Sequence, residues 1–306
     1  LAPRDGSPIT TPSQDIIIGN YYITLEERHR EGEGMIFNDA NEAILAYQNG
    51  YVQWHSRVGL RVASMPDKPF TPKQRKEILV TTVGKIILNT IFEKDFPFLN
   101  EPTKRNLAGH LPDKYFLKPG QNIYTYLKNS KLIPPFKKGM ISDIIAENYR
   151  RYHIAKTAVA LDNIKHWGYE NCMKSGLSFA IPDITKLKEK PSIIKAGKKK
   201  KQLVTQQYQM GLITNQERYE RVVGIWSRAK DQIQTKLSDY FNPENDIMMM
   251  ADSGARGNIS NFVQLAGMRG LMAEPNGKVM ELPITANFLE GLSIQQMFIS
   301  THGARK

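Results

Sequence analysis

An apolar stripe in the last third of the chain constrains the fold more than any other feature. Apolar side chains recur there at steps of three and four residues, with one break at Lys230: Tyr219, Val223, Trp226, Ile233, Leu237 and Tyr240. This spacing gives a helix one apolar face, which must pack against a partner helix. Just before it, Gly211 can end a preceding helix, while Thr214 and Glu217 can form a capping box. The sequence predicts an antiparallel helical hairpin whose first arm is kinked or interrupted by Pro191.

The rest of the chain mixes helix, strand and loop signals. The patterns predict an apolar run stopped by glycine at 14–19, helices at 41–48, 142–152 and 157–167 (the last capped by Gly168), and a half-buried strand at 51–58. Residues 81–89 fit either a strand or a helix that starts after Thr82. From residue 242 onward, glycines and methionines favour turns and loops. The expected fold class is helix-rich α+β, with a mixed N-terminal region, a protruding helical hairpin and a loop-rich C-terminal segment.

The charge balance favours a polyanionic partner. The chain of 306 residues carries 42 Lys and Arg against 30 Asp and Glu, a formal net charge of +12. Such a surface attracts nucleic acid, although a charge that only maintains solubility is the alternative. The densest basic run includes Lys198, Lys199, Lys200 and Lys201. This run fits either a solvated helix face or the docking of an anionic partner.

Cysteine content and hydropathy point to the cytoplasm. Cys172 is the only cysteine, so no disulfide can form within the chain, as is typical of a reducing compartment. No run approaches the roughly 18 apolar residues of a membrane span. Both ends of the sequence look cut from a longer protein.

Arg256 is the strongest candidate for a residue that binds phosphate. Gly254, Ala255 and Gly257 flank it, so a backbone or a ligand can approach closely. The guanidinium can bind two phosphate oxygens at once. The alternative is an arginine that pairs with Asp252 and only shapes the turn.

Motifs for autonomous catalysis are missing. Gly84-Lys85 lacks the following Ser or Thr and the earlier glycine of a phosphate-binding loop. The six histidines are scattered, and Asp-x-Asp does not occur, so we expect no metal site and no catalytic residue in this sequence.

Three segments carry a family resemblance. Residues 250–258 (MADSGARGN), 264–273 (QLAGMRGLMA) and 298–306 (FISTHGARK) resemble the catalytic beta-prime subunits of bacterial, multi-subunit, DNA-directed RNA polymerases. Upstream segments agree in the same register, including residues 12–15, 81–85 and 211–214. The resemblance therefore covers the whole chain, as an internal piece of such a subunit.

The resemblance implies three regions and a role in nucleotide delivery. Residues 1–157 correspond to the pore, 158–241 to the funnel with the hairpin at its rim, and 242–306 to the loop that supports the bridge helix and the start of that helix. Together they line the secondary channel, which brings nucleoside triphosphates to the active centre. The supporting-loop residues are Met268, Arg269, Gly270 and Gly277.

Site residues follow from the same resemblance. Arg256 corresponds to an arginine that reaches the incoming nucleotide, and Thr301 and His302 lie near the active centre. Lys198, Lys199, Lys200, Lys201 and Arg221 are candidates for docking regulators of the channel. One departure is Leu289, where the family usually has arginine.

The catalytic metal belongs elsewhere in the implied subunit. The family's Mg²⁺-binding motif, Asn-Ala-Asp-Phe-Asp-Gly-Asp, should precede Leu1, and the trigger loop should follow Lys306. The isolated chain should thus be inactive, although its parent is a nucleotidyltransferase. Expected partners are the beta, alpha, omega and sigma subunits, DNA, RNA, nucleoside triphosphates and secondary-channel regulators, with no membrane. The competing interpretation is a free-standing basic helical adaptor that binds nucleic acid or transcription regulators.

Overall fold

The computed structural model describes residues 2–4, 8–184, 186–239, 245–274 and 276–303. The chain divides into two compact units. The first comprises Leu1–Leu177 with Ser253–Arg256, and the second comprises Ser178–Asp252 with Gly257–Lys306. The three regions implied by the resemblance, 1–157, 158–241 and 242–306, stay a prediction.

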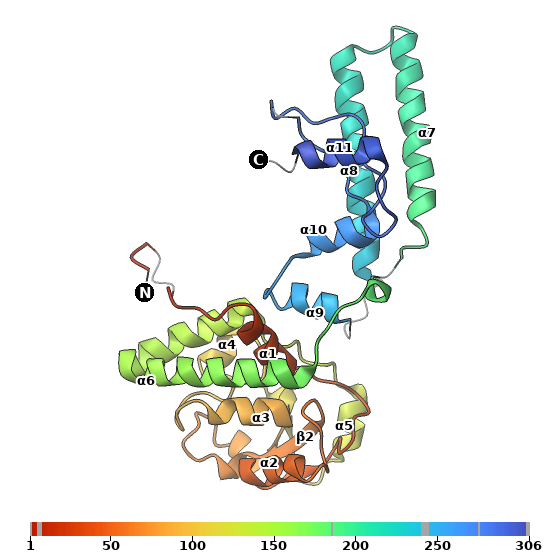
Figure 1. The fold of residues 1–306 in the computed structure, drawn as a ribbon. Helices are drawn as coiled ribbons and strands as arrows, with labels where there is room; N and C mark the ends of the chain where they lie inside the picture. Colours follow the sequence, from red (N-terminus) through yellow and green to blue (C-terminus); the bar gives the residue numbers. More distant parts are fainter. Residues whose placement is uncertain (1, 5–7, 185, 240–244, 275, 304–306) are drawn as a thin grey trace. The chain divides into compact units, whose positions relative to one another are not determined.

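The first unit combines helices with a small sheet (Figure 1). Its helices are α1 (Asp15–Ile23), α2 (Ala40–Gln48), α3 (Val83–Thr90), α4 (Lys104–Leu107), α5 (Ile123–Asn129) and α6 (Lys138–Ser175). Its strands are β1 (Ile36–Phe37), β2 (Arg57–Arg61), β3 (Ile78–Thr82) and β4 (Phe116–Leu117), and its 3₁₀ turns are η1 (Val62–Ser64), η2 (Gln74–Lys76) and η3 (Asp113–Tyr115). Among the described residues, the strands form a four-stranded sheet in the order β1-β2-β3-β4. The β1–β2 pair is parallel, and the other two pairs are antiparallel. Together with the second unit, this confirms the helix-rich α+β fold class.

The sheet and α3 share one core. Leu60 of β2 and Leu79 of β3 are opposite each other in the register, and both are fully buried. They pack in one cluster with Val83 and Ile86 of α3. The transition from β3 to α3 resolves the ambiguity at residues 81–89, because the Thr82 side chain accepts a hydrogen bond from the Lys85 backbone N–H and so caps the helix.

The strand expected at residues 51–58 is wrong for most of its length, since β2 starts only at Arg57. Contacts to other segments hold the preceding residues in turns. The carbonyl of Trp54 accepts a hydrogen bond from the Gly84 N–H, and the Ser56 hydroxyl donates to the Glu31 carbonyl. His55 Nε2 lies 2.8 Å from the Tyr22 carbonyl oxygen.

Two glycines allow α1 and α6 to cross so closely that their backbones touch. A Cβ atom at Gly19 would lie 1.9 Å from the carbonyl oxygen of Gly168, and one at Gly168 would lie 2.7 Å from the Ile16 side chain. Two predictions fail for this reason. Gly19 does not stop α1, and Gly168 does not end a helix, because both serve the crossing. The left-handed cap of α6 is Gly176, at φ 62°.

A break divides α6 near its middle, between the two helices expected at 142–152 and 157–167. His153 has φ 58° and ψ −162°, outside the helical region. The Thr157 hydroxyl contacts the His153 carbonyl at 2.6 Å and Asn148 Oδ1 at 3.1 Å. The buried Thr157 and Asn148 side chains thus bridge the break through polar contacts.

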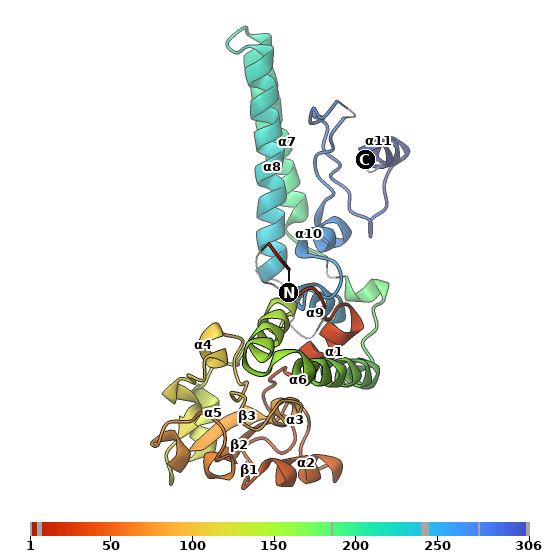
Figure 2. The ribbon, with the colours of Figure 1, turned by 90° about the vertical axis from the view of Figure 1, so that its left-hand side faces the viewer.

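The second unit is built on an antiparallel helical hairpin, which Figure 2 shows along its length. Its arms are α7 (Lys190–Gln209) and α8 (Asn215–Asp239), joined at residues 210–214. Gly211 has φ 73°, and the Thr214–Glu217 capping box is formed in both directions. The predicted hairpin and its cap are therefore confirmed. Further elements are η4 (Ile181–Asp183), α9 (Asp246–Asp252), α10 (Ile259–Phe262), a π-helical turn (Val263–Gly267) and α11 (Ile294–Gly303).

Details of the hairpin differ from the predicted stripe. Pro191 lies in the first turn of α7, where a missing N–H costs nothing, so it starts the arm and does not kink it. Val222, and not Val223, is fully buried beside Trp226. Trp226 is 2% exposed and packs over Gly197 of α7, where an added Cβ would lie 3.1 Å from the indole ring. Tyr240 lies outside the described residues.

Candidate functional site

Arg256 belongs to a turn that is attached to the first unit. The Lys138 N–H at the start of α6 donates to the Ser253 carbonyl at 2.9 Å, and Ser253 is fully buried. Gly254 has φ 74° and Gly257 has φ 75°, conformations that glycine adopts without strain. The Arg256 side chain is exposed, and within the described part of the first unit it makes no hydrogen bond or ion pair. The turn thus fixes the backbone and leaves the guanidinium available. Pairing with Asp252 would cross the boundary between the units and stays an alternative.

The predicted supporting loop forms a two-stranded ribbon in the second unit, which we call the supporting ribbon (residues 268–274 and 276–290). Gly270 and Ile284 exchange backbone hydrogen bonds of 3.0 and 2.9 Å, and the Met280 N–H donates to the Met272 carbonyl at 2.8 Å. Gly270 has φ 91° and Gly277 has φ 88°, so both use backbone conformations that favour glycine. The ribbon is therefore held by its own backbone pairing.

Apolar contacts seat the base of the ribbon on α8. Met268 is fully buried in a cluster with Ile233 and Leu237. Leu271 packs against the cluster that contains Trp226. Gly270 lies against the Lys230 side chain, which an added Cβ would approach to 3.1 Å. Successive ribbon residues thus contact successive turns of α8.

Arg269 anchors the ribbon to the segment before α11. Its guanidinium carbon lies 4.9 Å from the ring centre of Phe288, a cation–π distance, and its Nη1 donates to Gln264 Oε1 at 3.3 Å. The neighbouring Leu289, where the family usually has arginine, has its N–H bonded to the Leu265 carbonyl. That backbone bond does not depend on which side chain occupies position 289.

The last helix, α11, starts at a regular cap. The Ser293 hydroxyl accepts from the Gln296 N–H, and the Gln296 side chain accepts from the Ser293 N–H. Ile294 is 80% exposed and Phe298 is 76% exposed. Thr301 is exposed, and its hydroxyl donates to the Met297 carbonyl. The side chain of His302 and residues 304–306 lie outside the described part.

The basic residues proposed for regulator docking lie mostly at the surface of the hairpin. Lys198, Lys199 and Lys200 are exposed, and Lys201 is half-buried. Arg221 Nη1 donates to Gln207 Oε1 at 3.2 Å across the two arms. A groove of about 590 Å³ lies between the arms, with Leu203 and Val204 among its apolar lining residues and Arg221 at its edge. This arrangement suits an acidic partner with an apolar side chain.

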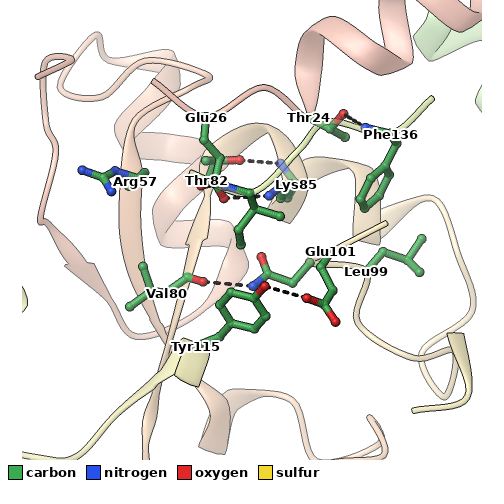
Figure 3. A network of polar contacts seen from close by, with 12 residues as sticks. Thr24, Glu26, Arg57, Val80, Thr82, Lys85, Leu99, Glu101, Tyr115 and Phe136 are labelled. Carbon is green, nitrogen blue, oxygen red and sulfur yellow. Dashed lines mark hydrogen bonds and ion pairs between the residues drawn. The ribbon is translucent and has the colours of Figure 1, made fainter. Parts of the chain in front are cut away.

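A buried polar network lies inside the first unit (Figure 3). Lys85 Nζ donates to Glu26 Oε1 at 2.7 Å, and the other Glu26 oxygen accepts from the Ile133 N–H at 2.8 Å. Desolvation by burial lowers the pKa of Lys85, although the Glu26 carboxylate opposes the shift. Nearby, the Tyr115 hydroxyl donates to Glu101 at 2.5 Å. Desolvation, together with this hydrogen bond, raises the pKa of Tyr115. The sequence analysis missed this network.

The structure brings together some of the predicted residues and not others. The ribbon and the hairpin contact each other within the second unit, whereas Arg256 belongs to the first. Among the described residues, there is no group of three or more His, Cys, Asp or Glu side chains that could hold a metal ion. Nor does any helix of the described part have the length and apolar character needed to cross a membrane.

Comparisons with known proteins agree over the whole chain. The family described as RNA polymerase Rpb1, domain 3 matches residues 1–184, and RNA polymerase Rpb1, domain 4 matches residues 195–289. This chain is 62% identical over 306 residues to the DNA-directed RNA polymerase subunit beta' of Levilactobacillus brevis and to that of Lactiplantibacillus plantarum. It is 58% identical to the same subunit of Limosilactobacillus fermentum. These matches cover 100% of this chain but only 25% of each relative. The chain therefore belongs to the family of DNA-directed RNA polymerase beta-prime subunits.

Proposed function

We propose that this chain lines the secondary channel of a bacterial DNA-directed RNA polymerase, through which nucleoside triphosphates reach the active centre. The observation that carries the proposal is the Arg256 turn. Its backbone is fixed to α6 through Ser253 and Lys138, while the guanidinium stays exposed. A guanidinium can bind two phosphate oxygens at once. Because the backbone of this turn is already fixed, binding would not carry the entropy cost of ordering it.

The C-terminal segment of the chain supports and begins the bridge helix in this proposal. The supporting ribbon contains Met268, Arg269, Gly270 and Gly277, and it is followed by α11. Ile294 and Phe298 of α11 are large and exposed, which fits a helix that other parts of the polymerase cover. Thr301 and His302 then belong to the part of the helix near the active centre.

The hairpin forms the rim of the channel. The proposed docking surface for acidic regulators consists of the exposed Lys198, Lys199 and Lys200, the half-buried Lys201, and Arg221 beside the apolar groove. The assembled enzyme further contains the beta, alpha, omega and sigma subunits, and it acts on DNA, RNA and nucleoside triphosphates in the cytoplasm.

The 306-residue chain alone should not transfer nucleotides. Phosphoryl transfer in such enzymes depends on metal ions that stabilise the charge on the attacking and leaving oxygens. We assign the Mg²⁺ ligands to a part of the subunit outside these 306 residues, because this sequence contains no Asp-x-Asp motif.

The test is RNA extension on a primed nucleic-acid scaffold with Mg²⁺. The full-length subunit, assembled with its partner subunits, should add nucleotides, and the isolated chain should add none. The isolated chain should instead compete with the full-length subunit during assembly. Extension by the isolated chain after removal of contaminating polymerase would contradict the proposal, as would failure of the full-length subunit to assemble with polymerase subunits.

A further inference from the structure

A bidentate ion pair joins the hairpin to the supporting ribbon. Arg218 Nη1 and Nη2 lie 2.6 and 2.7 Å from the two carboxylate oxygens of Glu281. The Asn215 side chain accepts from Arg218 Nε and Nη2, and the guanidinium carbon lies 5.4 Å from the centre of the Tyr208 ring. Residues from both arms of the hairpin thus orient Arg218 toward a single residue of the ribbon.

Two contacts beside the pair fix the same end of the ribbon. The Tyr219 hydroxyl donates to the Val279 carbonyl at 2.9 Å. Lys278 Nζ lies 4.9 Å from the centre of the Tyr219 ring. The ribbon end is therefore held through a charge pair, a backbone carbonyl and a cation–π contact, all made with two adjacent residues of α8.

A second ion pair holds the segment that leads to α11. Lys190 Nζ, at the start of α7, lies 2.5 Å from Glu290 Oε2. The Lys190 side chain is only 6% exposed. Glu290 precedes α11 by four positions, with Gly291 at φ 83° between them. The hairpin therefore restrains both the far end of the ribbon and the approach to α11.

We propose that Arg218 and Glu281 are a positioning pair for nucleotide addition. They hold the supporting ribbon at one register along the hairpin, and the ribbon in turn sets the position of the start of α11. This inference rests on the proposed function, in which α11 begins the bridge helix. Because each side chain is engaged by the other, we expect the pair to affect how fast bound nucleotide reacts and not how tightly it binds.

The physical basis is the geometry of the pair. A planar guanidinium with two parallel hydrogen bonds fixes orientation as well as distance, which a single contact does not. The side chains are 19% and 33% exposed, so the pair is partly shielded from water and salt. Its loss leaves the ribbon end with the two Tyr219 contacts and so loosens it against α8, while the apolar contacts of Met268 and Leu271 keep the base in place.

The experiment uses the full-length subunit assembled into polymerase. Arg218→Ala and Glu281→Ala should each lower kcat for nucleotide addition about two- to tenfold and leave KM for the nucleotide unchanged. Glu281→Gln, which keeps one hydrogen bond, should fall between wild type and Glu281→Ala. The exchange Arg218→Glu with Glu281→Arg should recover at least half of the loss. Arg150→Ala is the matched control, because it removes an arginine that is 74% exposed and whose ion pair with Glu147 lies within one helix.

Trypsin cleavage after Lys278 provides a readout that does not need activity. Cleavage should be faster in Arg218→Ala than in wild type and slow again in the exchanged pair. The reason is that trypsin needs a locally unfolded segment, and the ribbon end unfolds more readily when the ion pair is lost. Wild-type kinetics and wild-type cleavage in both alanine variants would overturn the inference, and so would a loss that the exchange does not recover. If the wild-type assembly makes no RNA, the proposed function fails, and the cleavage pattern still decides whether the pair holds the ribbon.

Discussion

Lys85 Nζ lies 2.7 Å from Glu26 Oε1 in the interior of the first unit, where the two side chains are 0% and 4% exposed. Removing both charges from water costs free energy. The attraction between the two charges offsets this desolvation cost, and the loss of either partner would leave the other charge buried without compensation. The second Glu26 oxygen accepts a hydrogen bond from the Ile133 N–H. The Thr24 hydroxyl accepts one from the Phe136 N–H (Figure 3). The segment at 133–136 is thus tied to the segment after α1 by polar groups in a largely apolar interior.

Lys85→Met should destabilise the first unit by about 3–5 kcal/mol, because it leaves the Glu26 carboxylate buried without its countercharge. The double variant Lys85→Met with Glu26→Gln should lose less than Lys85→Met alone, since no uncompensated charge remains. The measurement is the free energy of unfolding in urea for each variant. Equal losses in the single and double variants would show that burial of the carboxylate is not the cause.

Gly19→Ala should destabilise the crossing of α1 and α6 by about 1–3 kcal/mol or more, because its Cβ would lie 1.9 Å from a backbone oxygen of Gly168. Gly139→Ala is the matched control on α6, since nothing lies within 4 Å of a Cβ there. That change should leave stability unchanged or raise it by less than about 1 kcal/mol. Thermal midpoints of the two variants compare them directly. Similar midpoints would mean that the two helices can separate without cost.

Trp226→Ala should cost about 3–5 kcal/mol, because the ring is 2% exposed in the seam between α7 and α8. Leu212→Ala, at a residue 69% exposed near the hairpin tip, should change stability by less than about 0.5 kcal/mol. Helical circular dichroism during denaturation measures both. A small loss for Trp226→Ala would indicate that the arms hold together without the indole ring.

Acid should weaken the first unit through Glu27. The hydrogen bond from His55 is the largest cause that lowers the Glu27 pKa to about 2 from an ordinary 4.5. The stabilisation is therefore complete above about pH 4.5 and is lost as the pH falls toward 2. Glu27→Gln should show a smaller decrease in unfolding free energy than wild type over that interval. Parallel curves for the two proteins would rule out this contribution.

Local signals made the hairpin predictable from sequence. The three- and four-residue spacing, Gly211 and the Thr214–Glu217 box all lie within a short stretch, and each depends only on helix geometry. The helix at Ala40–Gln48 was predictable for the same reason, since Asn49 and Gly50 follow it. The predicted stripe was wrong at one position, because the structure buries Val222 where the spacing predicted Val223.

Contacts between distant segments explain what the sequence could not predict. The sequence predicts that Gly19 stops an apolar run and that Gly168 ends a helix, and only the crossing of α1 and α6 explains both glycines. Arg218 and Glu281 carry no local mark, because their pairing depends on the ribbon folding back along α8. The role in nucleotide binding that we propose for Arg256 comes from the resemblance, since the residues alone left phosphate binding and turn formation as alternatives.

The most direct test of the account is Arg256→Ala in the assembled polymerase, with Arg61→Ala as the control at another exposed arginine of the first unit. A charge-assisted contact to phosphate is worth about 1.5–3 kcal/mol, so kcat/KM for the nucleotide should fall roughly ten- to a hundredfold in Arg256→Ala and stay unchanged in Arg61→Ala. The denaturation midpoint of the 306-residue chain should not change in either variant. A lower midpoint for Arg256→Ala with unchanged nucleotide use would contradict the account and identify Arg256 as a structural residue of its turn.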